Sequence, residues 1–257
     1  FTDADTTHQV DSVRAAVESS LRANAGLLSV WPRQIMGSWA ERAVLPLLYL
    51  LTHTLLPQSL VAVLQRWPVL ARLVGPAALA GLGAANGQFM LFRRDVYDAI
   101  GGHAAVANHL VEDVALGRLI MARTGRGMRL INADGRGVVT CRMYHDFRGV
   151  WDGFSKNLRP VFGTNLPAFM ASGLVQVALF IAPFVFAVLP LPGQIWALGQ
   201  VVVVLGIRFL LAWRFGTGFA VVLWHPLAYL LAMVIALNSW RWSIRGTLRW
   251  KGRTYPA

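Results

Sequence analysis

Long runs of apolar residues fill the second part of this chain, whereas the first part has only short ones. Between Arg159 and Arg208 no side chain carries a charge, and this stretch is long enough for two membrane passes of about 20 residues each. A Pro-Leu-Pro-Gly sequence in its middle predicts a turn. We therefore predict one span over residues 168–189 and a second over 194–213, with Arg208 reaching toward the near membrane interface.

A third apolar run covers residues 218–240 and contains His225-Pro226, which could kink a helix there. If three helices cross from the cytoplasm, the basic tail lies outside, against the positive-inside tendency. The tail consists of Arg241, Arg245, Arg249, Lys251 and Arg253. Three helices are the preferred interpretation, and a re-entrant run is the alternative.

The uncharged window at residues 43–65 is also long enough to span a membrane. It contains Pro46 and Pro57, and Arg66 follows it, so a hairpin lying in the membrane interface is the competing interpretation. The pattern of apolar residues does not decide between the two.

Short alternating elements dominate the first part of the chain. Residues 89–92 predict a buried strand, and a helix with Asp95 as its N-cap follows and stops at Gly101. A second helix begins at residues 112–113 and ends near Gly125, and its apolar face consists of Leu116, Leu119 and Ile120. Residues 137–144 predict another strand, and residues 150–158 lead into the first span.

Composition supports a membrane protein. Of 257 residues, 56% are hydrophobic and 14% are charged, where soluble domains have about 25% charged residues. The 24 basic and 12 acidic residues give a net charge of +12, and nine of the basic residues but no acidic one follow Asp152. Because these basic residues flank apolar runs, we expect no nucleic-acid partner. A single cysteine, Cys141, excludes an intrachain disulfide.

Two acidic pairs are candidates for chemistry. Asp3 and Asp5 end an apolar strand and lie on one side of its pleat, where hard oxygen ligands suit Mg²⁺ or Mn²⁺ bridging to phosphate. Glu112 and Asp113 occupy the first turn of a helix, which the helix dipole alone would favour. Taken singly, each pair also fits a plain structural role.

Together, the order of these motifs is more specific. Asp-X-Asp at residues 3–5, Asn-Gly-Gln-Phe at 86–89 followed by Arg-Arg and Gly-Gly-His, and Glu-Asp at 112–113 make the chain resemble the family 2 glycosyltransferases. It is most similar to the membrane-bound, lipid-glycosylating branch, which includes ceramide glucosyltransferase and carotenoid- and hopanoid-associated enzymes.

The resemblance implies an α/β fold: part of a GT-A (Rossmann-like) catalytic domain, followed by C-terminal transmembrane helices. The catalytic part would cover residues 1–158, with an apolar membrane-interface insertion at 43–85. A membrane domain of two to three helices with a basic tail would cover 159–257. Because Asp5 and Asp113 must meet at one donor, residues 43–65 cannot cross the bilayer an odd number of times, which favours the interfacial hairpin.

The implied reaction is the inverting, metal-dependent transfer of a sugar from a nucleotide-diphosphate sugar to a lipid or isoprenoid hydroxyl. It would occur at the cytoplasmic face of the cell (inner) membrane. Asp5 would coordinate Mg²⁺ or Mn²⁺, and Asp3 would assist it or contact the ribose. Asp113 would be the general base, with Glu112 beside it.

Other residues would bind substrate by the same resemblance. Gly87 and Gln88 would line the sugar and acceptor pocket, with His103 at its rim. Many relatives carry a Gln/Arg-X-X-Arg-Trp motif before the membrane that is missing at residues 153–158, which argues against a processive polysaccharide synthase. Lys156 or Arg159 would supply a cation to the diphosphate instead.

Three further expectations complete the sequence-based picture. The family's nucleotide-binding strands precede Asp-X-Asp, so we expect this chain alone to bind nucleotide poorly and to be inactive. Transfer to a polyprenyl phosphate is the alternative reaction, and it needs no strong base. A non-catalytic membrane protein is the alternative of a different class, although residues 160–257 contain no carboxylate of the kind that transporters use.

Overall fold

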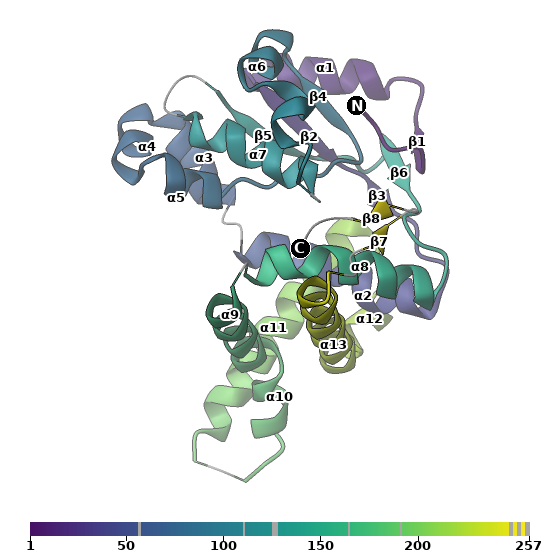
Figure 1. Ribbon diagram of the computed structural model, residues 1–257. Helices are drawn as coiled ribbons and strands as arrows, with labels where there is room; N and C mark the ends of the chain where they lie inside the picture. Colours follow the sequence, from purple (N-terminus) through teal and green to yellow (C-terminus); the bar gives the residue numbers. More distant parts are fainter. Residues whose placement is uncertain are drawn as a thin grey trace. The chain divides into compact units, whose positions relative to one another are not determined.

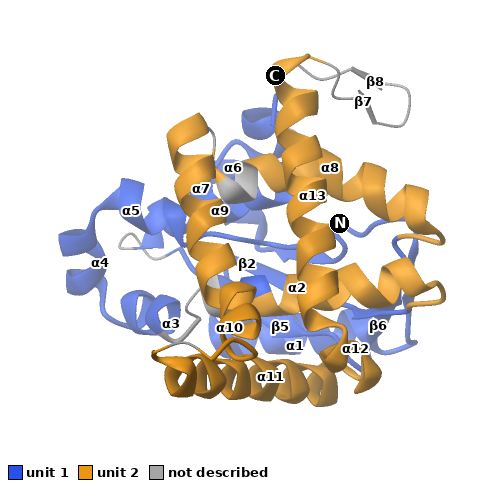
Figure 2. Cartoon of the chain, turned by 90° about the horizontal axis from the view of Figure 1, so that it is seen from below, with its two compact units in different colours: residues 1–35, 51–143 blue, residues 36–50, 144–257 orange. Residues whose placement is uncertain are grey.

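The computed structural model describes residues 1–55, 58–109, 111–124, 128–163, 165–190, 192–246, 249–250 and 253–254. They form two compact units (Figure 2). Unit 1 contains Phe1–Ile35 and Leu51–Met143, and unit 2 contains Met36–Leu50 and Tyr144–Ala257. The boundary between these units does not coincide with the predicted domain boundary at residue 158, because residues 36–50 and 144–158 group with unit 2. The domain division itself stays a prediction.

The larger sheet of unit 1 has the strand order β4-β2-β5 (Figure 1). Strand β2 (Leu27–Trp31) pairs antiparallel with β4 (Met90–Phe92) and parallel with β5 (Leu130–Asp134). Its first four residues are all buried, which is typical of a central strand that is covered on both faces. This sheet is therefore the core of unit 1.

A second small sheet has the order β1-β6-β3. It consists of β1 (Thr6–His8), β3 (Arg33–Gln34) and β6 (Val139–Cys141). Strand β6 pairs antiparallel with β1 and parallel with β3. The segment after the two N-terminal aspartates is thereby fixed beside Cys141.

Helices surround these sheets in unit 1. They are α1 (Ser12–Ala23), α3 (Gln58–Arg66), α4 (Pro68–Val74), α5 (Pro76–Gly81), α6 (Arg94–Ala99), the 3₁₀ helix η1 (Gly102–Val106) and α7 (Glu112–Ala122). Helix α7 packs through Leu116 and Ile120 into the same core as Leu27 and Leu130. A Cβ atom at Gly117 would lie 2.9 Å from the backbone nitrogen of Ala85, so glycine allows α7 its close approach to that loop.

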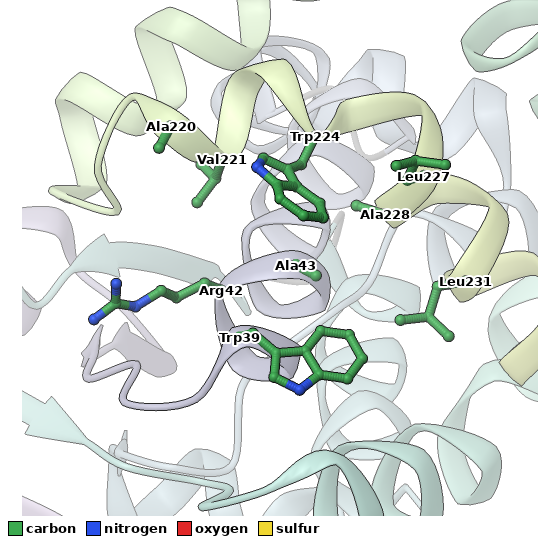
Figure 3. Close-up of a pocket in the computed structure, with 9 residues that line it drawn as sticks. All are labelled: Trp39, Arg42, Ala43, Ala220, Val221, Trp224, Leu227, Ala228 and Leu231. Atoms are coloured by element: carbon green, nitrogen blue, oxygen red, sulfur yellow. The ribbon is translucent and has the colours of Figure 1, made fainter.

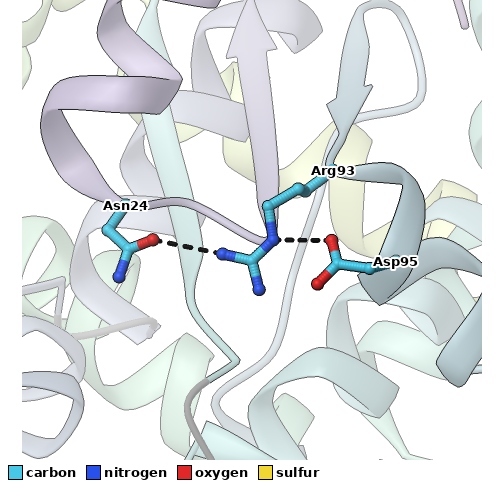
Figure 4. A network of polar contacts seen from close by, with 3 residues as sticks. All are labelled: Asn24, Arg93 and Asp95. Carbon is cyan, nitrogen blue, oxygen red and sulfur yellow. Dashed lines mark hydrogen bonds and ion pairs between the residues drawn. The ribbon is translucent and has the colours of Figure 1, made fainter.

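Arg93 connects three parts of unit 1 (Figure 4). Its guanidinium donates to Asn24 at 3.1 Å and to Asp95 at 2.7 Å. Asn24 ends α1 in the left-handed conformation, with φ of 47°. The predicted helix after residue 92 is confirmed, but Asp95 is not its N-cap: Arg93 holds that position, and the Asp95 carboxylate is engaged in this ion pair.

The described part of unit 2 is helical apart from one pair of short strands. Helix α2 (Trp39–Leu55) begins in this unit, and α8 (Phe147–Phe162), α9 (Leu166–Phe180), α10 (Ala182–Phe186), α11 (Gln194–Phe215), α12 (Ala220–Leu223) and α13 (His225–Ile244) follow. Strands β7 (Arg249–Trp250) and β8 (Arg253–Thr254) pair antiparallel. The ring of Tyr49 on α2 stacks on Phe215, with their centroids 3.9 Å apart.

Among the described residues, three helices are long and apolar enough to cross a membrane: Leu166–Phe186, Gln194–Phe215 and His225–Ile244. The predicted three apolar helices are therefore confirmed. The predicted third run, residues 218–240, is divided at Trp224 into α12 and α13, so the helix is interrupted just before His225-Pro226. Pro226 lies in the first turn of α13, where its missing N–H costs no hydrogen bond. The side of the membrane on which each helix ends stays a prediction.

Arg208 differs from its prediction. The side chain does not reach an interface: it is 2% exposed, and its guanidinium donates to the carbonyl of Val221 at 3.1 Å. The loop after α11 turns α12 back toward this residue, and the Val221 carbonyl provides an acceptor within the unit. Arg208 therefore has a hydrogen-bond acceptor within the protein and need not extend toward the membrane interface.

Residues 43–65 are helical on both sides of residues 56–57, in α2 and α3. Neither helix is among the three that are long and apolar enough to cross a membrane within the described residues. Pro46 lies inside α2. The hairpin interpretation and its place at a membrane interface both stay predictions.

Candidate active site

Asp113 is the second residue of α7 and accepts two backbone hydrogen bonds. Its Oδ2 accepts the N–H of Gly87 at 2.7 Å, and its Oδ1 accepts the N–H of Val114 at 2.8 Å. Backbone amides and the positive end of a helix both favour a carboxylate here. The predicted helix start at 112–113 is confirmed, and the tertiary contact to Gly87 fixes the orientation of Asp113.

Glycine at position 87 leaves room for this contact. A Cβ atom there would lie 3.2 Å from both Cβ and Oδ2 of Asp113. This distance is tighter than an ordinary contact, so the carboxylate would have to shift by a few tenths of an ångström to make room for a side chain. The Gly87 backbone thus lies against Asp113, and its predicted place in the sugar and acceptor pocket stays a prediction.

The environment of Asp113 raises the pKa of its carboxyl group. Burial is the largest cause, and the negative charges of Glu112 and Asp3 act in the same direction. The two backbone hydrogen bonds lower the pKa and only partly offset these effects. Asp113 therefore binds a proton more strongly than an ordinary aspartate does.

The N-terminal segment brings Asp3 into this region. Phe1 and Met90 exchange backbone hydrogen bonds, with the Met90 N–H donating to Phe1 at 2.9 Å. The N–H of Asp3 donates to the carbonyl of Gln88 at 3.2 Å. Asp3 is thus beside the Gly87-Gln88 segment, although 110 residues separate it from Asp113.

Asp5 lies near Cys141 on the adjoining sheet. Its carbonyl accepts the N–H of Arg142 at 3.4 Å. Burial, followed by the negative charges of Asp5 and Asp3, raises the pKa of the Cys141 thiol to about 12. The structure therefore brings Asp3, Asp5 and Asp113 into one region of unit 1, which we call the carboxylate cluster.

Gln88 connects the strands beneath the carboxylate cluster. Its side chain is 3% exposed. The amide nitrogen donates to Cys141 Sγ at 3.0 Å, and the amide oxygen accepts from Gln34 at 2.8 Å and from Asn86 at 3.2 Å. A substrate contact for Gln88 stays a prediction, and its observed contacts hold β3, β6 and the Gly87 loop together.

Ser29, Gln34 and Cys141 take part in this network, and the sequence reasoning did not assign them a role. Ser29 Oγ accepts the N–H of Asn86 at 2.7 Å. A signal existed for Ser29 and Gln34, because each is a polar residue in or beside a run of apolar strand residues. Their partners are 57 and 54 residues away along the chain, so pattern alone could not pair them.

His103 lies in an aromatic group that holds the first residue of the chain. Its ring centroid is 4.5 Å from that of Phe1, and its Nδ1 is 2.9 Å from the hydroxyl of Tyr97. Its contacts are with the segment that carries Asp3. The predicted place of His103 at the rim of a substrate pocket stays a prediction.

The remaining predicted residues have different surroundings. Glu112 is exposed in the first turn of α7. Lys156 lies on α8 and belongs to unit 2. Arg159, the alternative cation, has its guanidinium carbon 5.3 Å from the ring centroid of Trp240. The described contacts of Arg159 are thus within unit 2.

Asp3 and Asp5 are the members of the carboxylate cluster that could hold a divalent metal. Among the described residues, no group of three or more His, Cys, Asp or Glu side chains could hold a metal ion. Asp3 and Asp5 are both exposed. Mg²⁺ is usually held by one or two carboxylates, with phosphate oxygens and waters as the other ligands. A pair of aspartates is sufficient for such a site.

Comparisons with known proteins agree with these features. The model of glycosyl transferase family 21 matches residues 24–257. The chain is 27% identical to the 4,4'-diaponeurosporenoate glycosyltransferase of Staphylococcus aureus strain MRSA252, and 26% identical to those of strains bovine RF122 / ET3-1 and USA300. Each alignment covers 99% of this chain and 66% of the relative. No solved structure matches the chain significantly.

Proposed function

Since the chain belongs to glycosyl transferase family 21, we propose that it transfers a sugar from a nucleotide-diphosphate sugar to the hydroxyl of a lipid or isoprenoid acceptor. The observation that carries this proposal is the Asp113 carboxylate, oriented by the Gly87 N–H and close to Asp3. The chain spans 66% of the length of the relatives, so the proposal concerns the intact enzyme.

Asp113 acts as the general base in this proposal. The acceptor hydroxyl gives its proton to the carboxylate while its oxygen bonds to the anomeric carbon of the donor. The bond from that carbon to the diphosphate breaks, and the nucleoside diphosphate leaves with the electron pair, which inverts the configuration. The raised pKa of Asp113 supports the role, because a stronger base accepts the proton more readily.

Asp3 and Asp5 would hold Mg²⁺ or Mn²⁺. When bound, the metal would neutralise the negative charge that develops on the leaving diphosphate. The exposure of both carboxylates and their proximity to Cys141 support a shared role. Asp3 could instead contact the ribose of the donor.

The other predicted residues have supporting roles. Gly87 orients Asp113, Gln88 fixes the Gly87 loop from beneath, and His103 holds the segment of Asp3. Glu112 strengthens the base through its charge, which is one cause of the raised pKa of Asp113. A cation from Lys156 or Arg159 to the diphosphate stays a prediction.

The membrane location belongs to the same proposal. The part of the chain that the structure describes contains three helices long and apolar enough to cross a membrane, which supports a multi-pass protein. We place the carboxylate cluster on the cytoplasmic side of the cell (inner) membrane, where the bilayer provides the acceptor. Three crossings from this side would put the basic tail at residues 241–253 outside, against the positive-inside tendency, and a re-entrant apolar run would keep it inside.

A carboxylate acceptor is the second candidate. The relatives are named for a diaponeurosporenoate, a carboxylate. A carboxylate acceptor is already ionised near neutral pH, so the transfer of a sugar to it needs no general base. A polyprenyl phosphate would share this property. With a carboxylate acceptor the product would be a glycosyl ester, whereas an alcohol acceptor gives an O-glycoside.

One kinetic comparison tests both candidates. The intact wild-type enzyme and D113N are assayed with an isoprenoid alcohol and with the matching isoprenoid carboxylate. With the alcohol we expect D113N to lose about 10²–10⁴-fold in kcat. D98N is the matched control, because Asp98 is an exposed carboxylate of unit 1 that pairs with Arg94. If wild type uses only the carboxylate and D113N retains that rate, the second candidate is correct.

A further inference from the structure

A cavity of about 330 Å³ lies within unit 2. Helix α2 contributes Trp39, Arg42 and Ala43, and the opposite wall includes Trp224, Leu227 and Leu231 at the start of α13 (Figure 3). None of these residues belongs to the carboxylate cluster, all of whose members are in unit 1. The cavity is within the range of about 300–1,000 Å³ that is usual for small-molecule sites.

The start of α2 fixes the wall that Trp39 and Arg42 form. Ser38 Oγ accepts the N–H of Glu41 at 3.3 Å, and Glu41 Oε2 accepts the N–H of Ser38 at 2.5 Å. This is a capping box, which sets the first turn of the helix. The ring of Trp39 also stacks on Phe147, with centroids 5.4 Å apart and an interplanar angle of 15°. The wall is therefore formed before any ligand binds.

The cavity has one charged end and one apolar end. In Figure 3 the two tryptophan rings lie on opposite sides, with Arg42 at one end and Leu227 and Leu231 at the other. Arg42 is exposed, and its Nε is 3.4 Å from the carbonyl of Met36. No carboxylate among the described residues forms an ion pair with Arg42. A ligand that matches both ends is an apolar chain with an anionic head.

The position of the cavity on α13 indicates where such a ligand would come from. Helix α13 is one of the three helices that are long and apolar enough to cross a membrane. Trp39 is 64% exposed and Trp224 is 56% exposed, and exposed tryptophans of membrane proteins concentrate at the level of the lipid headgroups. At this level a lipid phosphate and the top of an acyl chain are adjacent.

We propose that this cavity binds an anionic membrane phospholipid. One acyl chain lies between Trp39 and Trp224 and extends toward Leu231, and the phosphate meets the guanidinium of Arg42. Arginine suits this role because its planar donors match phosphate oxygens. The lipid is a bound ligand of unit 2 and takes no part in the chemistry at Asp113.

Lipid binding to the intact protein tests the proposal. The detergent-solubilised protein is titrated with phosphatidylglycerol and with phosphatidylcholine of the same acyl chains, and bound lipid is counted by native mass spectrometry. We expect phosphatidylglycerol to bind more tightly. R42Q should lose about fivefold in phosphatidylglycerol affinity, as expected for one cation near a headgroup. R245Q is the matched control, because it removes an exposed arginine from the far end of α13.

A second pair of variants tests the apolar end. A43L fills part of the cavity from the half-buried helix face, and we expect it to weaken both lipids. A171L adds the same side chain to an exposed site on α9, and we expect it to weaken neither. Equal binding of the two lipids by wild type, or unchanged affinity in R42Q, would overturn the proposal. Displacement of the lipid by a neutral isoprenoid alcohol, equally from wild type and R42Q, would also overturn it and assign the cavity to the acceptor.

Discussion

The backbone N–H of Gly87 donates to Oδ2 of Asp113 over 2.7 Å, across 26 residues of chain. This bond connects the loop before β4 with the first turn of α7. It gives the carboxylate a fixed direction that the helix alone would not give. The proposed reaction depends on this relationship, because a general base must point at the proton it removes.

D113N should retain the fold and should not be less stable than wild type at neutral pH. Burial raises the pKa of Asp113 above the ordinary value of 3.8. The stability that the carboxyl group contributes is therefore greatest below the unfolded-state pKa, and it falls as the pH rises through the raised folded-state value. The neutral asparagine avoids this loss and can still accept the Gly87 hydrogen bond through its one amide oxygen, although it gives up the bond from the Val114 N–H. Thermal unfolding in detergent measures the effect, and a Tm several degrees below wild type would contradict it.

The pH profile of transfer to an alcohol acceptor should report the same group. Asp113 must be ionised to accept a proton, so kcat/KM should rise with pH through the raised pKa and then level off. The midpoint should lie above 3.8, the ordinary value for aspartate. Glu112 and Asp3 both raise this midpoint, so E112Q should move it downward. An unchanged midpoint of the pH profile in E112Q would show that the charge of Glu112 does not raise the pKa of Asp113.

G87A should slow the reaction without unfolding unit 1. The added Cβ would lie 3.2 Å from Asp113 Oδ2 and would move the carboxylate by a fraction of an ångström. Because a misplacement of about 1 Å can cost roughly 10²-fold in rate, we expect about a tenfold loss of kcat. G81A is the control, because a Cβ there meets nothing within 4 Å. Equal rates for G87A and G81A would show that the position of Asp113 is not critical.

Cys141 should resist alkylation in the folded protein. Its side chain is 1% exposed, and its pKa is raised to about 12. At about pH 8 almost no thiolate is present, and the thiolate is the reactive form. Incubation with iodoacetamide followed by mass spectrometry should show labelling only after denaturation. Rapid labelling of the native protein would mean that the network around Gln88 is open.

The apolar helices and the helix that carries Asp113 could be predicted from the sequence because their signals are local. An uncharged run of about 20 residues indicates a span by itself, and Glu112 and Asp113 mark a helix start by the dipole argument. Strand β4 was also predicted, one residue longer than the structure shows. Each of these signals lies within a few residues of the element it predicts.

Strands β2 and β5 were not predicted, because their evidence is not local. They pair Leu27 with Leu130 across about 100 residues, and only the folded sheet makes them neighbours. The hydrogen bond between the Gln34 and Gln88 side chains could not be predicted for the same reason. Nor could the hydrogen bond of Arg208, whose acceptor is the backbone carbonyl of Val221. Pairings of this kind depend on tertiary packing, which no spacing of residue types records.

The most direct test of the central claim is sugar transfer in membranes. The intact wild-type enzyme and D113N are incubated with a panel of nucleotide-diphosphate sugars and a membrane lipid extract, and mass shifts on the lipids are read by mass spectrometry. We predict that one donor gives a lipid heavier by one sugar residue with wild type, and that D113N loses this product while it remains folded. The same product at the same rate from folded D113N, or no shift from any donor with folded wild type, would contradict the account.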